Sequence, residues 1–161
     1  MVVSGLPVAM PGDSHAVEIV KLAIQLVSVV QTVTIQTRNG TIKPIHIRCG
    51  IHSGDVVAGV AGDVNPRYCL FGDTVNTASR MESNSELNRI HISKNTYDCL
   101  EREKRNGSTD LVSMQLLPRG GVEIKGKGDM ETFWVENVAC ASNVLTQMLY
   151  IKSLGAAQYS P

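Results

Sequence analysis

The sequence lacks a long hydrophobic run, carries few aromatic residues and has no excess of charge of either sign. Its longest apolar stretch, 16–30, contains four polar or charged positions and falls short of the roughly 20 apolar residues that cross a bilayer. Lysine and arginine total 15, as do aspartate and glutamate, so the chain lacks the positive field that nonspecific nucleic-acid binding needs. Aromatic residues make up only 4%, which argues against a platform for stacking bases. We therefore expect neither a nucleic-acid polymer as a partner nor contact between this segment and a membrane.

The cysteines show no Cys-x-x-Cys pair; they stand at positions 49, 69, 99 and 140. A chain of 161 residues is long enough to bury a core without disulfide bonds. The first seven residues have no basic region and are too short for a signal peptide. These features predict reduced thiols and a cytoplasmic location.

Hydrophobic residues make up 43% of the chain, enough for one domain with a buried core. Apolar stretches with strand character alternate with helical ones. We expect strands over 1–4, 45–52, 68–71, 89–93, 111–117 and 121–135, and helices over 15–30, 73–83 and 94–103. Strands interleaved with helices predict an α/β sandwich, in which helices pack on a sheet.

The first two helices have clear local signals. Over 15–30 the polar positions step by three, four and three residues and form one stripe, which predicts a helix that is mostly buried. Asp13 or Ser14 is expected to cap it, because short oxygen-bearing side chains accept hydrogen bonds from free helix amides. Asp73 or Thr74 is expected to cap the second helix in the same way, so Asp73 is assigned to capping rather than to ligand binding.

Two common kinds of site are not predicted. The glycines at 54, 59 and 62 lack the Gly-Lys-Ser/Thr ending of a P-loop, so we expect them to mark turns and close backbone approach. The four histidines and four cysteines offer no pair with zinc spacing. We therefore assign no metal ligand within this chain.

Asn76 and Arg80 stand four positions apart and project from one face of the predicted helix. An arginine there can donate two hydrogen bonds to phosphate oxygens, and the asparagine amide can bond a sugar hydroxyl. The start of the helix adds a partial positive charge. Taken alone, such a pair is usually a solvated helix face.

The surrounding residues favour the ligand-binding interpretation. The stretch 67–83, Arg-Tyr-Cys-Leu-Phe-Gly-Asp-Thr-Val-Asn-Thr-Ala-Ser-Arg-Met-Glu-Ser, resembles the signature of class III nucleotidyl cyclases, guanylate cyclase branch, and is closest to the receptor type. Flanking motifs at 47–54, 57–60, 89–93 and 123–128 follow in the order of that family. The resemblance implies a partial guanylate cyclase catalytic domain over 1–138. It leaves 139–161 as a C-terminal tail, in which the spacing of the apolar residues at 144, 145, 148 and 149 allows a short helix.

The resemblance also implies a role for individual residues. Cys69 matches the position that reads guanine, where adenylyl cyclases carry aspartate. Asn76 matches the asparagine that positions the ribose, and Arg80 the arginine that stabilises the phosphate transition state. Lys125 matches the lysine that holds the triphosphate, with Lys127 as a less favoured substitute. The remaining matches line the base pocket: Leu70, Phe71 and Val75.

The family fold is a ferredoxin-like α/β sandwich that works as a head-to-tail dimer, and this chain is expected to lack its first strand and first helix. Family members bind two Mg²⁺ or Mn²⁺ ions through two aspartates, which the resemblance places upstream of residue 1 or on the partner chain. The implied reaction converts GTP into cyclic GMP and pyrophosphate, with a second cyclase chain, identical or different, completing the site. If the chain is part of a membrane receptor, it lies on the cytoplasmic side. Two alternatives stay open: an adenylyl cyclase of the same class, and an inactive fragment that binds nucleotide or a partner.

Overall fold

The structure, a computed structural model, describes residues 1–137 of the chain. The tail predicted over 139–161 lies outside the described residues. The elements, in chain order, are α1 (Ser14–Val30), β1 (Thr34–Gln36), β2 (Ile42–Pro44), β3 (Cys49–Ile51), β4 (Val57–Ala61), β5 (Arg67–Phe71), α2 (Asp73–Ser83), β6 (Ile90–Ser93), α3 (Lys94–Arg105), a short 3₁₀ turn (Thr109–Leu111), β7 (Met114–Ile124) and β8 (Gly128–Asn137).

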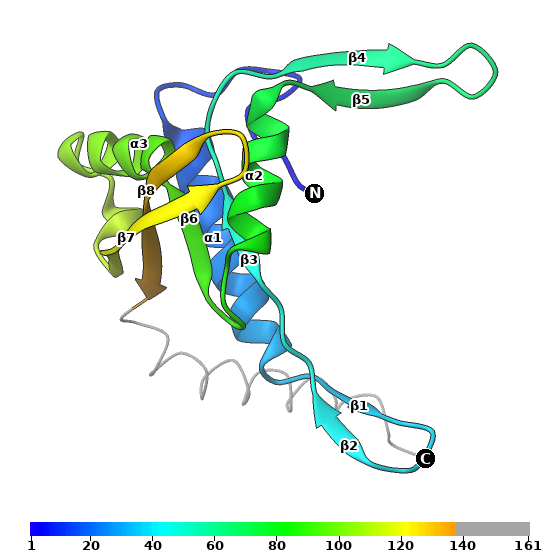
Figure 1. The fold of residues 1–161 in the computed structure, drawn as a ribbon. Coiled ribbons are helices and arrows are strands. Elements are labelled where there is room, and N and C mark those ends of the chain that lie inside the picture. The colour runs from blue at the N-terminus through cyan, green and yellow to red at the C-terminus, as the bar shows by residue number, and fades with distance from the viewer. Residues whose placement is uncertain (138–161) are drawn as a thin grey trace, which may run out of the picture.

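The centre of the fold is a four-stranded sheet in the order β3-β6-β8-β7 (Figure 1). Strand β3 runs parallel to β6, while β6–β8 and β8–β7 are antiparallel. Because side chains alternate across a strand, neighbouring residues of β6 face opposite sides of the sheet. Ile90 and Ile92 join the apolar core with residues of α1 and α3, whereas His91 bonds Met81 of α2. The predicted α/β sandwich is confirmed, with α1 and α3 on one face and α2 on the other.

Helix α1 agrees with the sequence pattern. Its buried positions are Ala16, Val17, Val20 and Ala23, and they belong to the main core. Its predicted side-chain cap is wrong. Asp13 occupies the cap position without a capping hydrogen bond, because its carboxylate accepts from Arg102 of α3 instead.

Two hairpins extend away from these layers (Figure 1). Hairpin β1–β2 encloses the predicted linker at 37–40, and its strand residues are all exposed. Hairpin β4–β5 pairs Val57 with Phe71 at its base and Ala61 with Arg67 near its tip. It leaves large apolar side chains in solvent, namely Val57, Val60, Val64, Tyr68 and Phe71.

Four predicted strands need correction. Those expected over 111–117 and 121–135 are instead β7, which continues through 118–120 as far as Ile124, and β8, which begins at Gly128. Residues 1–4 form no strand, because they pair with no other strand in the described part of the chain, and Met1 is 78% exposed. The strand predicted over 45–52 is shorter, since only Cys49–Ile51 pairs with β6. Before it, the carbonyl of Ile47 accepts from the backbone nitrogen of Asn88 at 2.7 Å, but the nitrogen of Ile47 donates to the side chain of Asn88, so the strand ladder is not continued there.

Three of the cysteines, Cys49, Cys69 and Cys99, carry free thiols, as predicted; Cys140 lies outside the described residues. Within residues 1–137 no helix is long and apolar enough to cross a membrane.

Candidate functional site

Helix α2 begins directly after β5, and the turn between them has a clear cause. Gly72 joins the two elements with φ of 133°, a conformation that favours glycine. Thr74, in the first turn of the helix, donates from its hydroxyl to the carbonyl of Asp55 at 2.7 Å. These two features fix the direction in which the helix leaves the hairpin.

Asp73 does not cap α2, which corrects the prediction. It is the first residue of the helix, the cap position belongs to Gly72, and no side-chain cap bond forms. Its carboxylate instead accepts a hydrogen bond from Lys127 in the turn between β7 and β8. That bond holds the pKa of Asp73 below its usual range. A full positive charge attracts the carboxylate more strongly than a backbone amide does, so the ion pair replaces the cap.

Arg80 lies one turn after Asn76 on α2, between the buried side chains of Thr77 and Met81. Asn76 is exposed and Arg80 is half-buried. The Nη1 atom of Arg80 is buried and has no hydrogen-bond partner among the described residues. The Cβ position built on Gly126 lies 3.9 Å from that atom, so the guanidinium faces the turn that carries Lys125 and Lys127.

The turn between β7 and β8 thus brings positive charge to the side of α2. Lys125 is exposed in this turn, and Lys127 is held by Asp73. His52 lies close enough for the charges of Lys127 and Asp73 to affect it, but burial is the main reason why its pKa is lowered. Its Nδ1 atom lies 2.7 Å from the hydroxyl of Ser93. The arrangement is a small cationic surface with one acidic group.

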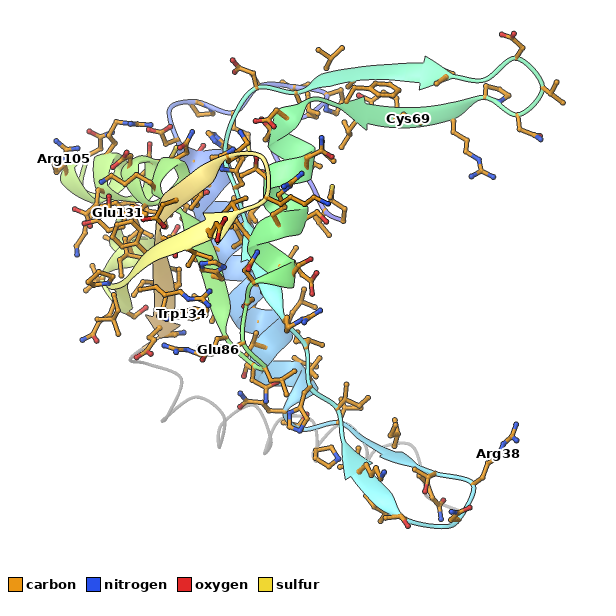
Figure 2. All side chains as sticks on the ribbon, viewed as in Figure 1. Arg38, Cys69, Glu86, Arg105, Glu131 and Trp134 are labelled. Carbon is orange, nitrogen blue, oxygen red and sulfur yellow. The ribbon has the colours of Figure 1, made fainter. Side chains whose placement is uncertain are left out.

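The residues predicted to contact the base lie on the hairpin side of α2. Cys69 and Leu70 are half-buried on β5, Phe71 is 50% exposed, and Val75 is half-buried in the first turn of α2. Figure 2 shows Cys69 out on β5, away from the four-stranded sheet. The structure therefore brings Arg80, Asp73 and Lys127 together, and it leaves Cys69 separate from the lysine-bearing turn.

The ion pair between Asp73 and Lys127 was not predicted from the sequence. The signal that could have found the pair is charge complementarity between the start of the signature helix and the Lys-Gly-Lys-Gly turn. His52 gave no such signal, because only the parallel pairing of β3 and β6 brings it next to Ser93.

Among residues 1–137, Asp13, His15 and Cys99 offer ligand atoms within 4.8 Å of one another. This cluster does not suit a cation. Arg102 donates two hydrogen bonds to the carboxylate of Asp13, at 2.6 and 3.1 Å, and a third to the sulfur of Cys99 at 3.3 Å. Burial, the largest cause, raises the pKa of the Cys99 thiol to about 11, which keeps it protonated at neutral pH.

Comparison with known proteins points to one family. The family model described as "Adenylate and Guanylate cyclase catalytic domain" matches residues 1–137. Human atrial natriuretic peptide receptor 2 is 48% identical over 135 residues, which is 84% of this chain and 12% of that receptor. Guanylate cyclase 32E of Drosophila melanogaster is 48% identical over 135 residues, again 84% of this chain, and the match spans 11% of that protein. The chain therefore spans about an eighth of the length of these relatives or less.

Solved structures agree. The guanylate cyclase domain of RhGC from Catenaria anguillulae, in complex with GTP, superposes with a TM-score of 0.68 at 42% identity, covering 83% of this chain and 65% of that one. A guanylyl cyclase domain of the RhoGC fusion protein from Blastocladiella emersonii, described as a non-canonical dimer, superposes with a TM-score of 0.63 at 36% identity, covering 83% of this chain and 64% of that one.

Proposed function

Because the chain belongs to the family of adenylate and guanylate cyclase catalytic domains, we propose that it supplies the guanine-, ribose- and phosphate-binding part of a guanylate cyclase site. In this reaction the ribose 3′-hydroxyl of GTP gives up its proton to solvent, and its oxygen attacks the α-phosphorus. The bond from that phosphorus to the bridging oxygen breaks, and pyrophosphate leaves with the electron pair. The relative named guanylate cyclase 32E and the GTP complex of the Catenaria domain support this choice of nucleotide.

The observation that carries the proposal is the unpaired Nη1 of Arg80. A buried donor without a partner costs about 1–3 kcal/mol, and more when it is charged. Phosphate oxygens are the acceptors that a guanidinium bonds best, because its planar fork matches their geometry. In the proposed site Arg80 bonds the transferring phosphate and stabilises the charge that develops on it. Lys125, in the turn beside Arg80, binds the rest of the triphosphate.

The base and the ribose occupy the hairpin side of α2 in this proposal. Asn76, exposed one turn before Arg80, positions the ribose. Cys69 reads the guanine, since a thiol is a weak donor that suits the O6 carbonyl. The base pocket is completed by apolar side chains, namely Leu70, Phe71 and Val75.

The described residues do not fit a pair of divalent ions. Mg²⁺ and Mn²⁺ prefer several oxygen ligands, and Asp73, the carboxylate whose charge interacts with Arg80, is already bound by Lys127. We therefore propose that the ligands of two such ions lie outside residues 1–137, on another segment or on a partner chain.

A second cyclase chain, identical or different, is the proposed partner. The exposed apolar side chains of hairpin β4–β5 suit burial against such a chain, because a patch of this kind is unusual on a surface that stays in water. The non-canonical dimer of the Blastocladiella domain supports association between cyclase chains in general, and not this particular contact. The proposed domain extends over 1–138, and the family match to 1–137 supports that boundary.

The test mixes the 161-residue chain with a second cyclase chain that keeps its metal-binding carboxylates. In that second chain, alanine replaces the two residues that match Asn76 and Arg80. With GTP and Mn²⁺ we expect cyclic GMP from the mixture, and none from either chain alone. The Arg80→Ala variant of this chain should lower the rate of product formation by about 10² to 10³.

Other results would favour the alternatives. Cyclic AMP from ATP in place of cyclic GMP would identify an adenylyl cyclase. Bound GTP without product in any mixture would identify an inactive nucleotide-binding fragment. Cyclic GMP from this chain alone, within about tenfold of the mixture, would show that its own carboxylates bind the ions.

A further inference from the structure

We propose that Arg119 and His91 are positioning residues that hold the last turn of α2, and with it Arg80, against the sheet. The inference rests on the proposed role of Arg80. Neither residue touches the cationic surface described above. They act through two backbone carbonyls at the C-terminal end of the helix, those of Met81 and Asn84.

The end of a helix leaves carbonyl oxygens without partners inside the helix. In α2 these oxygens find other donors. The carbonyl of Arg80 accepts from the backbone nitrogen of Asn84 at 3.0 Å and from its side-chain amide at 2.8 Å. The carbonyl of Met81 lies 2.8 Å from Nδ1 of His91, and that of Asn84 accepts from Nη1 of Arg119 at 2.6 Å. Two of the three are therefore held by side chains of the sheet.

The contacts also fix the tautomer of His91, which is fully buried. The carbonyl of Met81 can only accept, so Nδ1 must carry the hydrogen and Nε2 is left as an acceptor. Nη1 of Arg119 lies 3.1 Å from Nε2 and 3.4 Å from Nδ1. This nitrogen carries two hydrogens: one bonds the carbonyl of Asn84, and the other faces the ring, where only Nε2 can accept. One arginine therefore joins the histidine to the end of the helix.

An irregularity in the sheet places Arg119 beside the C-terminal end of α2. The register of β7 against β8 shifts between Pro118 and Gly120, so Arg119 has no strand partner opposite it. Its guanidinium carbon lies 4.5 Å from the ring centroid of Trp134 on β8, and that of Arg89 lies 4.0 Å from the same ring. Figure 2 labels Trp134 in this layer. The bulge and the aromatic ring orient Arg119 toward α2.

The network depends on a neutral His91. Burial, the largest cause, lowers the pKa of His91, and the charge of Arg119 on β7 lowers it further. The carbonyl of Met81 on α2 and the charge of Glu86, in the loop before β6, act in the opposite direction. A proton on Nε2 would leave two donors facing each other and two positive charges in contact. Arg119 would then leave Nε2 and loosen its hold on Asn84.

The first test compares Arg119→Ala with Arg89→Ala, a matched control. Both remove a guanidinium over Trp134, but Arg119 bonds the backbone carbonyl at the end of α2, whereas the side chain of Arg89 pairs, among the described residues, only with the carboxylates of Glu86 and Glu136. Hydrogen exchange measured by mass spectrometry should rise over residues 80–85 in Arg119→Ala and stay unchanged there in Arg89→Ala. Arg119→Lys, a milder change, should give an intermediate rise because an ammonium lacks the planar fork. Unchanged exchange in both Arg119 variants would overturn the inference.

The second test measures cyclic GMP production in the mixture described above. Displacement of a group that acts in the transition state costs up to about 10²-fold in rate. We therefore expect Arg119→Ala to lower kcat at least tenfold, with KM for GTP within about twofold, and Arg89→Ala to change neither. Raised hydrogen exchange with an unchanged kcat would overturn the proposed link between Arg119 and Arg80. The Arg80→Ala variant tests the proposed function separately.

The third test uses pH. His91→Asn keeps an amide donor near the position of Nδ1 and removes the titrating ring. Below about pH 6 the wild-type kcat should fall more steeply than that of His91→Asn, because only the wild-type ring can take up a proton in this range. Superimposable pH profiles would overturn the requirement for a neutral His91.

Discussion

Gly50 of β3 lies so close to α2 that a Cβ atom at this position would overlap the backbone nitrogen of Glu82. The atoms it would meet are all backbone atoms of the helix, which cannot move aside as a flexible side chain can. The absence of a side chain at Gly50 thus sets the distance between the sheet and the helix that carries Asn76 and Arg80.

Replacing Gly50 by alanine should therefore be severely destabilising. Overpacking of a core usually costs about 1–3 kcal/mol, and a clash with backbone belongs at or above the upper end. Gly59→Ala is the control, because a Cβ there meets nothing within 4 Å. It should change the free energy of unfolding by no more than about 0.5 kcal/mol. Urea unfolding of the two variants measures the difference, and equal midpoints would show that α2 can move away from β3.

Arg80→Ala should lower kcat for cyclic GMP formation by about 10² to 10³ with a smaller effect on KM. The reason is that the proposed contact stabilises charge that develops only in the transition state. Arg38→Ala, in the exposed turn of hairpin β1–β2, is the matched control and should leave both constants unchanged. A near-normal kcat for Arg80→Ala, with the helix content unchanged by circular dichroism, would mean that Arg80 has no role in the reaction and is simply a residue on the solvated face of the helix.

Cys69→Asp should weaken the use of GTP and allow turnover of ATP. A carboxylate accepts from the exocyclic amine of adenine and repels the O6 carbonyl of guanine. We expect the ratio of kcat/KM for GTP to that for ATP to fall at least about tenfold. Cys69→Ser, which keeps a small donor, should retain the preference for GTP. An unchanged ratio in Cys69→Asp would place guanine recognition elsewhere.

The pair of Asp13 and Arg102 should make stability depend on acid pH. The two hydrogen bonds from Arg102 are the main reason why the pKa of Asp13 is lowered in the folded protein. When folding lowers the pKa of a carboxyl group, the ionised group stabilises the folded protein. This stabilisation is complete above the pKa of the unfolded chain, about 3.9, and it is lost as the pH falls through the lower pKa of the folded protein. Wild type should therefore exceed Asp13→Asn in urea midpoint above about pH 5, and the difference should vanish near about pH 2.

The control for this pair is Asp110→Asn. Asp110 accepts from Lys21 at 3.2 Å in an exposed ion pair. Exposed pairs of this kind contribute about 0–1 kcal/mol, so the variant should differ little from wild type at any pH. If the stability of Asp110→Asn depended on pH as strongly as that of Asp13→Asn, the effect would come from the net charge of the protein and not from the bonds between Arg102 and Asp13.

Local patterns predicted most elements because the features that define them are local. The polar stripe predicted α1 over 15–30, and the helix spans Ser14–Val30. Pairing is not local, and the errors follow from this. Residues 1–4 have the composition of a strand but lack a partner among the described residues. Asp73 has the chemistry of a cap, but its partner Lys127 lies 54 positions further along the chain.

The candidate site likewise contains features that the sequence could predict and features that it could not. The spacing of Asn76 and Arg80 was visible in the sequence because both stand on one helix. Their proposed roles came from the resemblance to a family, and spacing alone did not supply them. His91 and Arg119 escaped prediction, because the bulge between Pro118 and Gly120 that directs Arg119 forms only when β7 pairs with β8.

The parallel pairing of β3 with β6 bears on the order in which the chain folds. Cys49 lies opposite Ile90, whereas β7 and β8 are joined directly by the short turn at Lys125–Lys127. Contacts between residues distant in sequence form late, since a long loop must close before they form. We expect the β7–β8 hairpin to form first. The pairings of β6 with β8 and of β3 with β6 both join residues distant in sequence, so we expect them to follow in the slow step. Pulse-labelling hydrogen exchange during refolding should therefore protect the amides of β7 and β8 before those of Cys49–Ile51, and simultaneous protection would contradict this order.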